Sequence, residues 1–343
     1  MADLSIQFRA LHHIDLNADS IKSVAVIKEA RDINEYISEL LEKVTSEKNK
    51  RLFDFASETS EVRAAISKIV DKSSFEENSQ IIANRLLRIE KETQERYDQI
   101  TDIHKGSLLQ ALLTHDGTKT FIIIKVDHNA FLDEADLRKR VGLPFERRVL
   151  KAVVVEMSDD GEITKTDIYD SNTAISSYWW KYFLELMEIN TDYNNTKTSF
   201  NAIDSVLNRY IKQAFPSDYT FLRNNVIAYY RTQLTFNLDD LVNSAIGSYE
   251  PLDGSLDLED LKEKIFILPE KKKFDRRFSI ERKAVSARFR RVIALHEKID
   301  LNLKEDIENL EEIITPYKDK TGEKFISIKS ENGYYAFLRE KKK

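Results

Sequence analysis

The chain has 343 residues, of which 41% are hydrophobic and 33% charged, a composition typical of a globular protein with two or three domains. Cysteine is absent, which excludes disulfides, zinc–thiolate sites, iron–sulfur clusters and thiol nucleophiles. The net charge of −6 at pH 7 does not by itself indicate a nucleic-acid partner.

Glycine is scarce, and its spacing excludes two nucleotide-binding motifs. The chain has eight glycines, and none stands close enough to another to form a dinucleotide-binding fingerprint or a P-loop. The G-x-S-x-G elbow of serine hydrolases is also absent. No apolar run approaches the ~20 residues that span a bilayer, and no signal peptide is visible, so we expect a cytoplasmic protein.

The first hundred residues predict one strand followed by helices. Residues 4–16 mix apolar and polar side chains, as a strand does. Apolar residues then recur at helical spacing, and Asp32 stands three residues before Glu35, which resembles a capping box. We expect helices over residues 32–50, 61–70 and 75–103.

The next segment changes to the pattern of β-hairpins. Apolar runs at 107–113 and 121–126 flank a turn that contains Asp116 and Gly117. Runs at 148–157 and 162–169 flank a similar turn that ends at Gly161. These four strands should form one antiparallel sheet packed by the preceding helices, and the segment after Asp127 suggests a helix starting at Asp133.

The rest of the chain predicts a helical middle and a β-rich end. Residues 174–246 show aromatic helix faces, and Pro251 and Gly254 mark a linker over 249–255. Residues 291–303 alternate, and runs at 313–314 and 325–328 flank a turn at 318–322. We therefore predict an α+β fold with an antiparallel sheet built from hairpins, divided into a domain over 1–170, a helical region over 171–250 and a basic, β-rich region over 251–343.

Charge is segregated near the C-terminus. Ten basic residues against two acidic ones lie between Lys271 and Arg291, whereas residues 300–323 hold eight acids and three lysines. Three phenylalanines, at 274, 278 and 289, interleave with the basic residues, and we expect them to anchor the segment in a core. The basic residues are Lys271, Lys272, Lys273, Arg276, Arg277, Arg282, Lys283, Arg288, Arg290 and Arg291.

A second basic patch and the first one together suggest a phosphate-binding surface. The second patch contains Arg138, Lys139, Arg140, Arg147, Arg148 and Lys151, against the single acid Glu146. The alternative is that the arginines of the first block pair with the acids of residues 300–323.

Metal and nuclease sites have only weak support. Asp127 and His128, with Asp133, Glu134 and Asp136, form the densest group of possible ligands, but a solvated loop followed by the start of a helix explains them better, because no other spacing supports a metal site. Glu281-Arg282-Lys283 has the letters of a restriction-type nuclease motif, but it lies in the basic block, which we expect to be helical. We therefore expect no metal, no cofactor and no catalytic residues.

Eight segments stand in an order that matches a known family. They are 48–50, 55–61, 120–127, 222–230, 236–241, 298–303, 309–314 and 319–329. In this order they resemble the bacterial nucleoid-associated protein family (the YejK/NdpA-like group), over roughly residues 5–330. The resemblance implies a cytoplasmic, DNA-binding protein of the nucleoid without catalytic activity. It supplies no DNA-contacting residues, so those named above rest on charge.

Three hypotheses follow from these observations. The first is a DNA-binding protein that contacts the phosphate backbone of double-stranded DNA with little sequence preference, as a homodimer. The second is a protein–protein interaction subunit of a bacterial phage-defence or DNA-processing assembly. The third is a metal-dependent nuclease.

Overall fold

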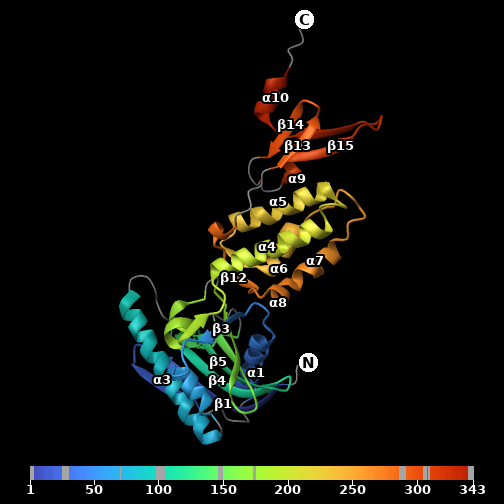
Figure 1. Cartoon of the computed structure of the whole chain (residues 1–343). Coiled ribbons are helices and arrows are strands. Elements are labelled where there is room, and N and C mark those ends of the chain that lie inside the picture. The colour runs from blue at the N-terminus through green and yellow to red at the C-terminus, as the bar shows by residue number, and fades with distance from the viewer. Residues whose placement is uncertain are drawn as a thin grey trace. The chain divides into compact units, whose positions relative to one another are not determined.

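The chain forms two units in the computed structural model, which describes residues 4–24, 31–69, 71–97, 105–145, 150–172, 175–285, 291–303, 307 and 310–338 (Figure 1). Unit 1 contains Met1–Thr191 and Asp275–Phe278, and unit 2 contains Asp192–Phe274 and Ser279–Lys343. This division differs from the expected boundaries after residues 170 and 250. Residues 171–191 belong to unit 1 because their last part adds a strand to its sheet.

Unit 1 is built on an eight-stranded sheet in the order β10-β3-β9-β8-β5-β4-β1-β2, with antiparallel neighbours throughout. The predicted α+β fold with an antiparallel sheet is therefore confirmed. The strands are β1 (Leu4–Asp15), β2 (Ser20–Val24), β3 (Arg51–Phe55), β4 (Gly106–His115), β5 (Thr118–Asp127), β8 (Leu150–Met157), β9 (Ile163–Asp170) and β10 (Leu186–Glu188).

The two predicted hairpins of the central sheet are present, and their turns explain the register. Asp116 and Gly117 both have positive φ, at 47° and 80°, as a two-residue hairpin turn of the I′ type requires. His115 consequently pairs with Thr118, and the alternation continues along both strands. Gly161, with φ 89°, serves the turn between β8 and β9.

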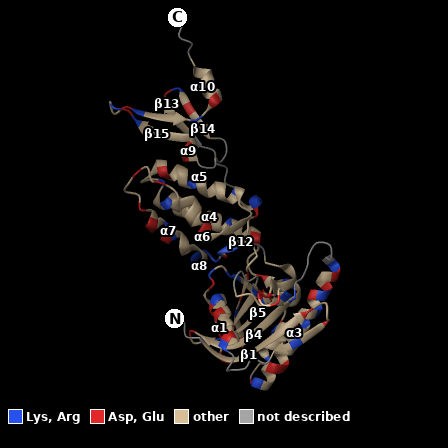
Figure 2. Ribbon diagram, turned by 180° about the vertical axis from the view of Figure 1, so that it is seen from behind, with Lys and Arg blue, Asp and Glu red and all other residues tan. Residues whose placement is uncertain are grey.

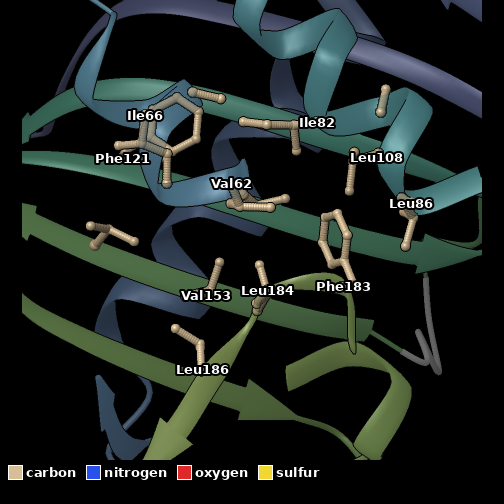
Figure 3. Close-up of a cluster of buried hydrophobic side chains, with 14 of the residues drawn as sticks. Val62, Ile66, Ile82, Leu86, Leu108, Phe121, Val153, Phe183, Leu184 and Leu186 are labelled. Carbon is tan, nitrogen blue, oxygen red and sulfur yellow. The ribbon is translucent and has the colours of Figure 1, made fainter. Parts of the chain in front are cut away.

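The sheet is covered on both faces. Alternate residues of β5 separate into two cores: Phe121 and Ile123 contact one apolar cluster, while Ile122 and Ile124 contact the other. The first cluster packs beneath α2, α3 and η1 (Figure 3), and the second packs beneath α1. These elements are α1 (Arg31–Ser46), α2 (Glu61–Ser67), α3 (Lys72–Tyr97) and η1 (Tyr178–Phe183).

Two segments of unit 1 differ from the prediction. The aromatic stretch at Tyr178–Phe183 is a short π-helix rather than the start of the helical region. Asp133 begins no helix, because it stands in the turn between β6 (Asn129–Leu132) and β7 (Lys139–Gly142), a separate two-stranded hairpin. Within that turn, the backbone N–H of Leu137 donates to the carbonyl of Asp133.

Unit 2 begins with helices that enclose an aromatic core. The Tyr230 hydroxyl donates to Ser199 Oγ at 2.7 Å, and its ring contacts Phe200 and Phe236. The elements of this region are α4 (Asp192–Tyr210), α5 (Pro216–Thr232), β11 (Thr235–Asn237), α6 (Leu238–Leu241), η2 (Val242–Gly247), α7 (Leu258–Phe266), α8 (Leu268–Lys272) and the 3₁₀ segment η3 (Arg282–Ala284). The strand β12 (Arg277–Ser279) spans the boundary between the two units along the chain.

The end of unit 2 carries the predicted strands. They form two hairpins with short helices: β13 (Arg291–His296), β14 (Ile299–Leu303), α9 (Leu310–Ile313), β15 (Ile314–Lys318), β16 (Lys324–Ile328) and α10 (Glu331–Phe337). The expected linker at 249–255 lies inside unit 2 instead of between domains. The buried carboxylate of Asp218 accepts from the Tyr249 hydroxyl at 2.8 Å and from the Leu252 N–H at 2.7 Å, which ties this segment to α5.

Candidate nucleic-acid interface

Five of the predicted phosphate-binding residues are exposed on two short segments of unit 2, the end of α8 and the start of η3. We call this set the basic surface. Figure 2 labels α8 and draws Lys and Arg in blue. None of the five has an ion-pair partner within the described ranges, and no ion pair there joins them to the acids of residues 300–323. The set contains Lys271, Lys272, Lys273, Arg282 and Lys283.

The segments that carry the basic surface are fixed by buried neighbours. Lys273 ends α8 in the left-handed conformation, with φ 57°, and the next residue, Phe274, is buried against Phe236. The Glu281 N–H donates to Thr196 Oγ1 on α4 at 3.0 Å, and Ala284 is buried at the end of η3. The prediction that Phe274 and Phe278 are core anchors is confirmed, since both are buried.

Both segments pack against the same helix, α4. Their charges are therefore held on one scaffold, although the exposed acids Glu270 and Glu281 lie in the same stretches and reduce the positive excess. A rigid array of ammonium and guanidinium groups can neutralise neighbouring phosphates of a nucleic-acid backbone.

The other residues of the first block are placed differently. Arg277 belongs to unit 1, where its guanidinium donates to the carbonyls of Asn172 at 2.8 Å and Asp170 at 3.3 Å. Arg276 is partly buried beside it. Arg288, Arg290 and Phe289 lie outside the described residues, and Arg291 is described only as the first residue of β13.

The second basic patch does not form one surface. Arg140 is paired with Asp133 at 2.7 Å and with Asp136 at 2.9 Å, whereas Arg138 and Lys139 are exposed on the same hairpin. The turn acids balance this hairpin's positive charge. Lys151 is buried on β8, 3.7 Å from Asp170, because its strand lies at the centre of the sheet. Arg147 and Arg148 lie outside the described residues.

The weak metal and nuclease signals gain no support from the geometry. Among the residues that the structure describes, no three His, Asp or Glu side chains are grouped as metal ligands would be. Asp133 and Asp136 are engaged with Arg140. Glu281-Arg282-Lys283 spans the start of an exposed 3₁₀ turn, not a strand of the sheet, so it lacks the placement that a restriction-type site requires.

Unit 1 contains a buried ionic cluster that the sequence patterns did not predict. Lys125 on β5 lies 2.5 Å from Glu90 Oε1 on α3, and both side chains are almost fully buried. Asp127 Oδ1 lies 3.3 Å from the ammonium nitrogen of Lys125, and 17% of the Asp127 side chain is exposed to solvent. Burial lowers the pKa of Lys125, but Glu90, Tyr178 and Asp127 together outweigh this effect and hold the pKa above its ordinary value.

The cluster continues along the sheet. Lys125 and Lys151 are paired residues on β5 and β8, and both ammonium groups lie 5.8 Å from the ring of Tyr178. Burial raises the pKa of the Tyr178 hydroxyl, so it stays protonated at neutral pH. Because Glu90 and Lys125 are closed to solvent, we interpret this ion pair as a structural contact that joins α3 to the sheet.

A second polar cluster joins β1, β4 and the residue after β5. The Ser107 hydroxyl lies 2.6 Å from His13 Nδ1 and 2.7 Å from His128 Nε2. A hydroxyl has one proton, so at least one imidazole must donate to it when all three groups interact. Burial lowers the pKa of both histidines, that of His128 to about 4, and Ser107 is buried. This arrangement fastens three strands together.

Comparisons with known proteins supply no identity for the chain. No family model matches it, and no curated protein matches it at a significant level. The resemblance to nucleoid-associated proteins therefore stays a prediction. Within the described ranges, none of the helices is long and apolar enough to cross a membrane.

Proposed function

We propose that the chain binds double-stranded DNA through the phosphate backbone, in a nucleoid-associated role, with the basic surface of unit 2 as its main contact. One observation carries the proposal: five exposed cations without ion-pair partners in the described ranges stand on two segments anchored to α4. Such cations release counterions from DNA, which gives affinity without sequence preference. A homodimer is part of the proposal, because two linked weak sites bind with higher avidity.

The proposal predicts how steeply DNA affinity falls as the salt concentration rises. Each neutralised phosphate contributes about −0.9 to the slope of log K against log salt, so five cations allow a slope down to about −4.5 per chain. Fluorescence anisotropy of a labelled duplex, repeated at several salt concentrations and with two unrelated sequences, measures both the slope and the sequence preference.

A matched pair of variants tests the surface itself. K271Q/K272Q/R282Q/K283Q removes four charges from the basic surface, and K318Q/K320Q/K324Q/K329Q removes four exposed charges from the C-terminal hairpin. The first variant should flatten the slope by about 3 to 4, and the second should leave it near that of the parent chain. Equal effects of the two variants would show that net charge acts, not this surface.

A protein partner is the second candidate, and the β6–β7 hairpin favours it. This hairpin exposes half or more of each of four large apolar side chains, those of Phe131, Leu132, Leu137 and Val141. Isolated two-stranded hairpins are seldom stable in water, and their edges readily accept another strand. A partner captured from nuclease-treated extract by the parent chain, but not by L132S/L137S, would support this role.

A further inference from the structure

Unit 2 contains a small polar pocket that the DNA-binding proposal does not use. It has a volume of about 140 Å³, opens to solvent, and lies between α5, η2 and α9. Its polar lining comes from Asn225, Thr232, Gln233, Ser244, Ser248 and Glu311. The chemistry of a pocket this small is decided by which of these groups still have hydrogen-bonding capacity.

The hydroxyl protons of the lining are used within the protein, so its remaining side-chain donors are N–H groups of the Asn225 and Gln233 amides. The hydroxyls of Thr232, Ser244 and Ser248 each donate to the backbone carbonyl four residues earlier in their own helix. The Asn225 amide donates to the carbonyl of Ala245 at 3.5 Å. Tyr229, which also lines the pocket, donates its hydroxyl proton to the carbonyl of Asn237 at 3.1 Å.

The acceptor atoms of the lining outnumber these remaining N–H donors. Each hydroxyl oxygen keeps a free lone pair, and the amide oxygen of Asn225 has one as well. Glu311 adds a carboxylate whose Oε2 is buried and has no hydrogen-bond partner among the described residues. A buried carboxylate oxygen without a donor is costly, so a donor supplied from outside would stabilise this site.

The backbone holds Glu311 at the pocket. Asn224, a fully buried residue of α5, exchanges two hydrogen bonds with Ile307: its amide donates to the Ile307 carbonyl, and its Oδ1 accepts from the Ile307 N–H at 2.9 Å. This pairing fixes the chain just before α9, which packs on α5. Glu311 stands on α9 and lines the pocket from there.

We propose that this pocket binds a guanidinium or alkylammonium group. The lining presents acceptors and one negative charge, and these groups present several N–H donors and one positive charge. A neutral ligand of the same shape would leave the carboxylate without its charge partner, and an anion would be repelled. The cation can belong to a free small molecule or to an arginine side chain of a partner.

Titration calorimetry with n-butylguanidinium tests the charge, with n-butylurea as a neutral ligand of nearly the same shape. We expect n-butylguanidinium to bind at least tenfold more tightly than the urea. The variant E311Q should lose at least tenfold in affinity for the cation, while the control E312Q, at the exposed neighbouring position, should bind as the parent chain does. S248V, which removes one acceptor and fills space, should also weaken binding.

Two further probes distinguish the sources of the cation. Agmatine represents a free small molecule, and the peptide acetyl-Gly-Arg-Gly-amide represents a side chain of a partner. Binding of agmatine alone identifies a metabolite-sized ligand, and binding of both identifies a site open to a protein. Failure of n-butylguanidinium to bind, equal binding of the urea, or full binding by E311Q would overturn the proposal. None of these results depends on whether the chain binds DNA.

Discussion

The buried pair of Glu90 and Lys125 should be strongly coupled, and its removal gives a quantitative test of unit 1. Lys125→Met keeps the length of the side chain but leaves the carboxylate of Glu90 in an apolar core. Removing one member of a buried ion pair costs about 3–5 kcal/mol, because the remaining charge loses its partner. Asp127 is not left in the same state, because part of its side chain reaches solvent.

The double variant E90L/K125M completes a double-mutant cycle, which measures the coupling free energy between Glu90 and Lys125. Replacing both charges by apolar side chains removes the desolvation cost together with the attraction, so we expect it to lie within about 1–2 kcal/mol of the parent chain. The coupling free energy of the double-mutant cycle should therefore exceed about 2 kcal/mol. The exposed pair Asp19 and Lys91 is the control, and D19N/K91M should cost less than about 1 kcal/mol.

Tryptophan fluorescence makes the measurement specific to unit 1. The chain has two tryptophans, Trp179 and Trp180, and both lie in η1 of this unit. Urea unfolding followed at this signal should show the midpoint of Lys125→Met lowered by roughly 1–2 M. A cost below about 1 kcal/mol for the single variant, or additive single costs in the double variant, would refute the reasoning.

Three other predictions concern stability. Burial lowers the pKa of His128 to about 4 from 6.5, so the unfolded chain binds more protons than the folded chain between these pH values. After allowance for the partly exposed ring, the free energy of unfolding of unit 1 should fall by about 1–2 kcal/mol as the pH falls from 6.5 to 4. Urea titrations at several pH values should show a flatter pH dependence for H128Q. Gly106→Ala should cost about 1–3 kcal/mol by the same tryptophan assay, because the added Cβ would lie 2.8 Å from the Val126 carbonyl oxygen and 3.1 Å from Lys125 Cε. Lys273→Gly should stabilise unit 2 by about 1 kcal/mol, because the φ of 57° at this position strains a residue that carries a side chain. The same variant should reduce the magnitude of the DNA salt slope by about 0.9, the contribution of one phosphate contact. Thermal unfolding followed by near-ultraviolet circular dichroism measures the first effect, and fluorescence anisotropy measures the second.

Local sequence patterns predict the two central hairpins, but they do not predict which strands pair over long distances in the sequence. Asp116 and Gly117 fix a turn with two positive φ angles, so strand ends and register follow from two residues. The strand β3 has no such partner nearby, because it pairs with β9 and β10, which lie more than a hundred residues later. Periodicity within a window contains no information about that pairing.

The candidate site residues also depend on contacts between distant parts of the chain, which local sequence patterns do not predict. Charge alone selected Lys271 and Arg282, which the structure shows as exposed, but it could not distinguish them from Arg277 or Lys151, whose partners come from other parts of the chain. Lys125 sits in an apolar run whose pattern says only that it belongs to a strand. That Glu90 lies opposite it depends on how α3 packs on the sheet, which the sequence pattern does not specify.

The return of Asp275–Phe278 to unit 1 has a consequence for biosynthesis. Arg51, a buried residue of β3, is paired with Glu188 at 2.9 Å and with Asp275 at 3.4 Å. On a ribosome that adds about 5–20 residues per second, the 84 residues from Thr191 to Asp275 take about 4–17 s to emerge. Until the end of that interval Arg51 lacks its partner Asp275, so unit 1 cannot complete this contact before the helices α4 to α8 of unit 2 have been synthesised.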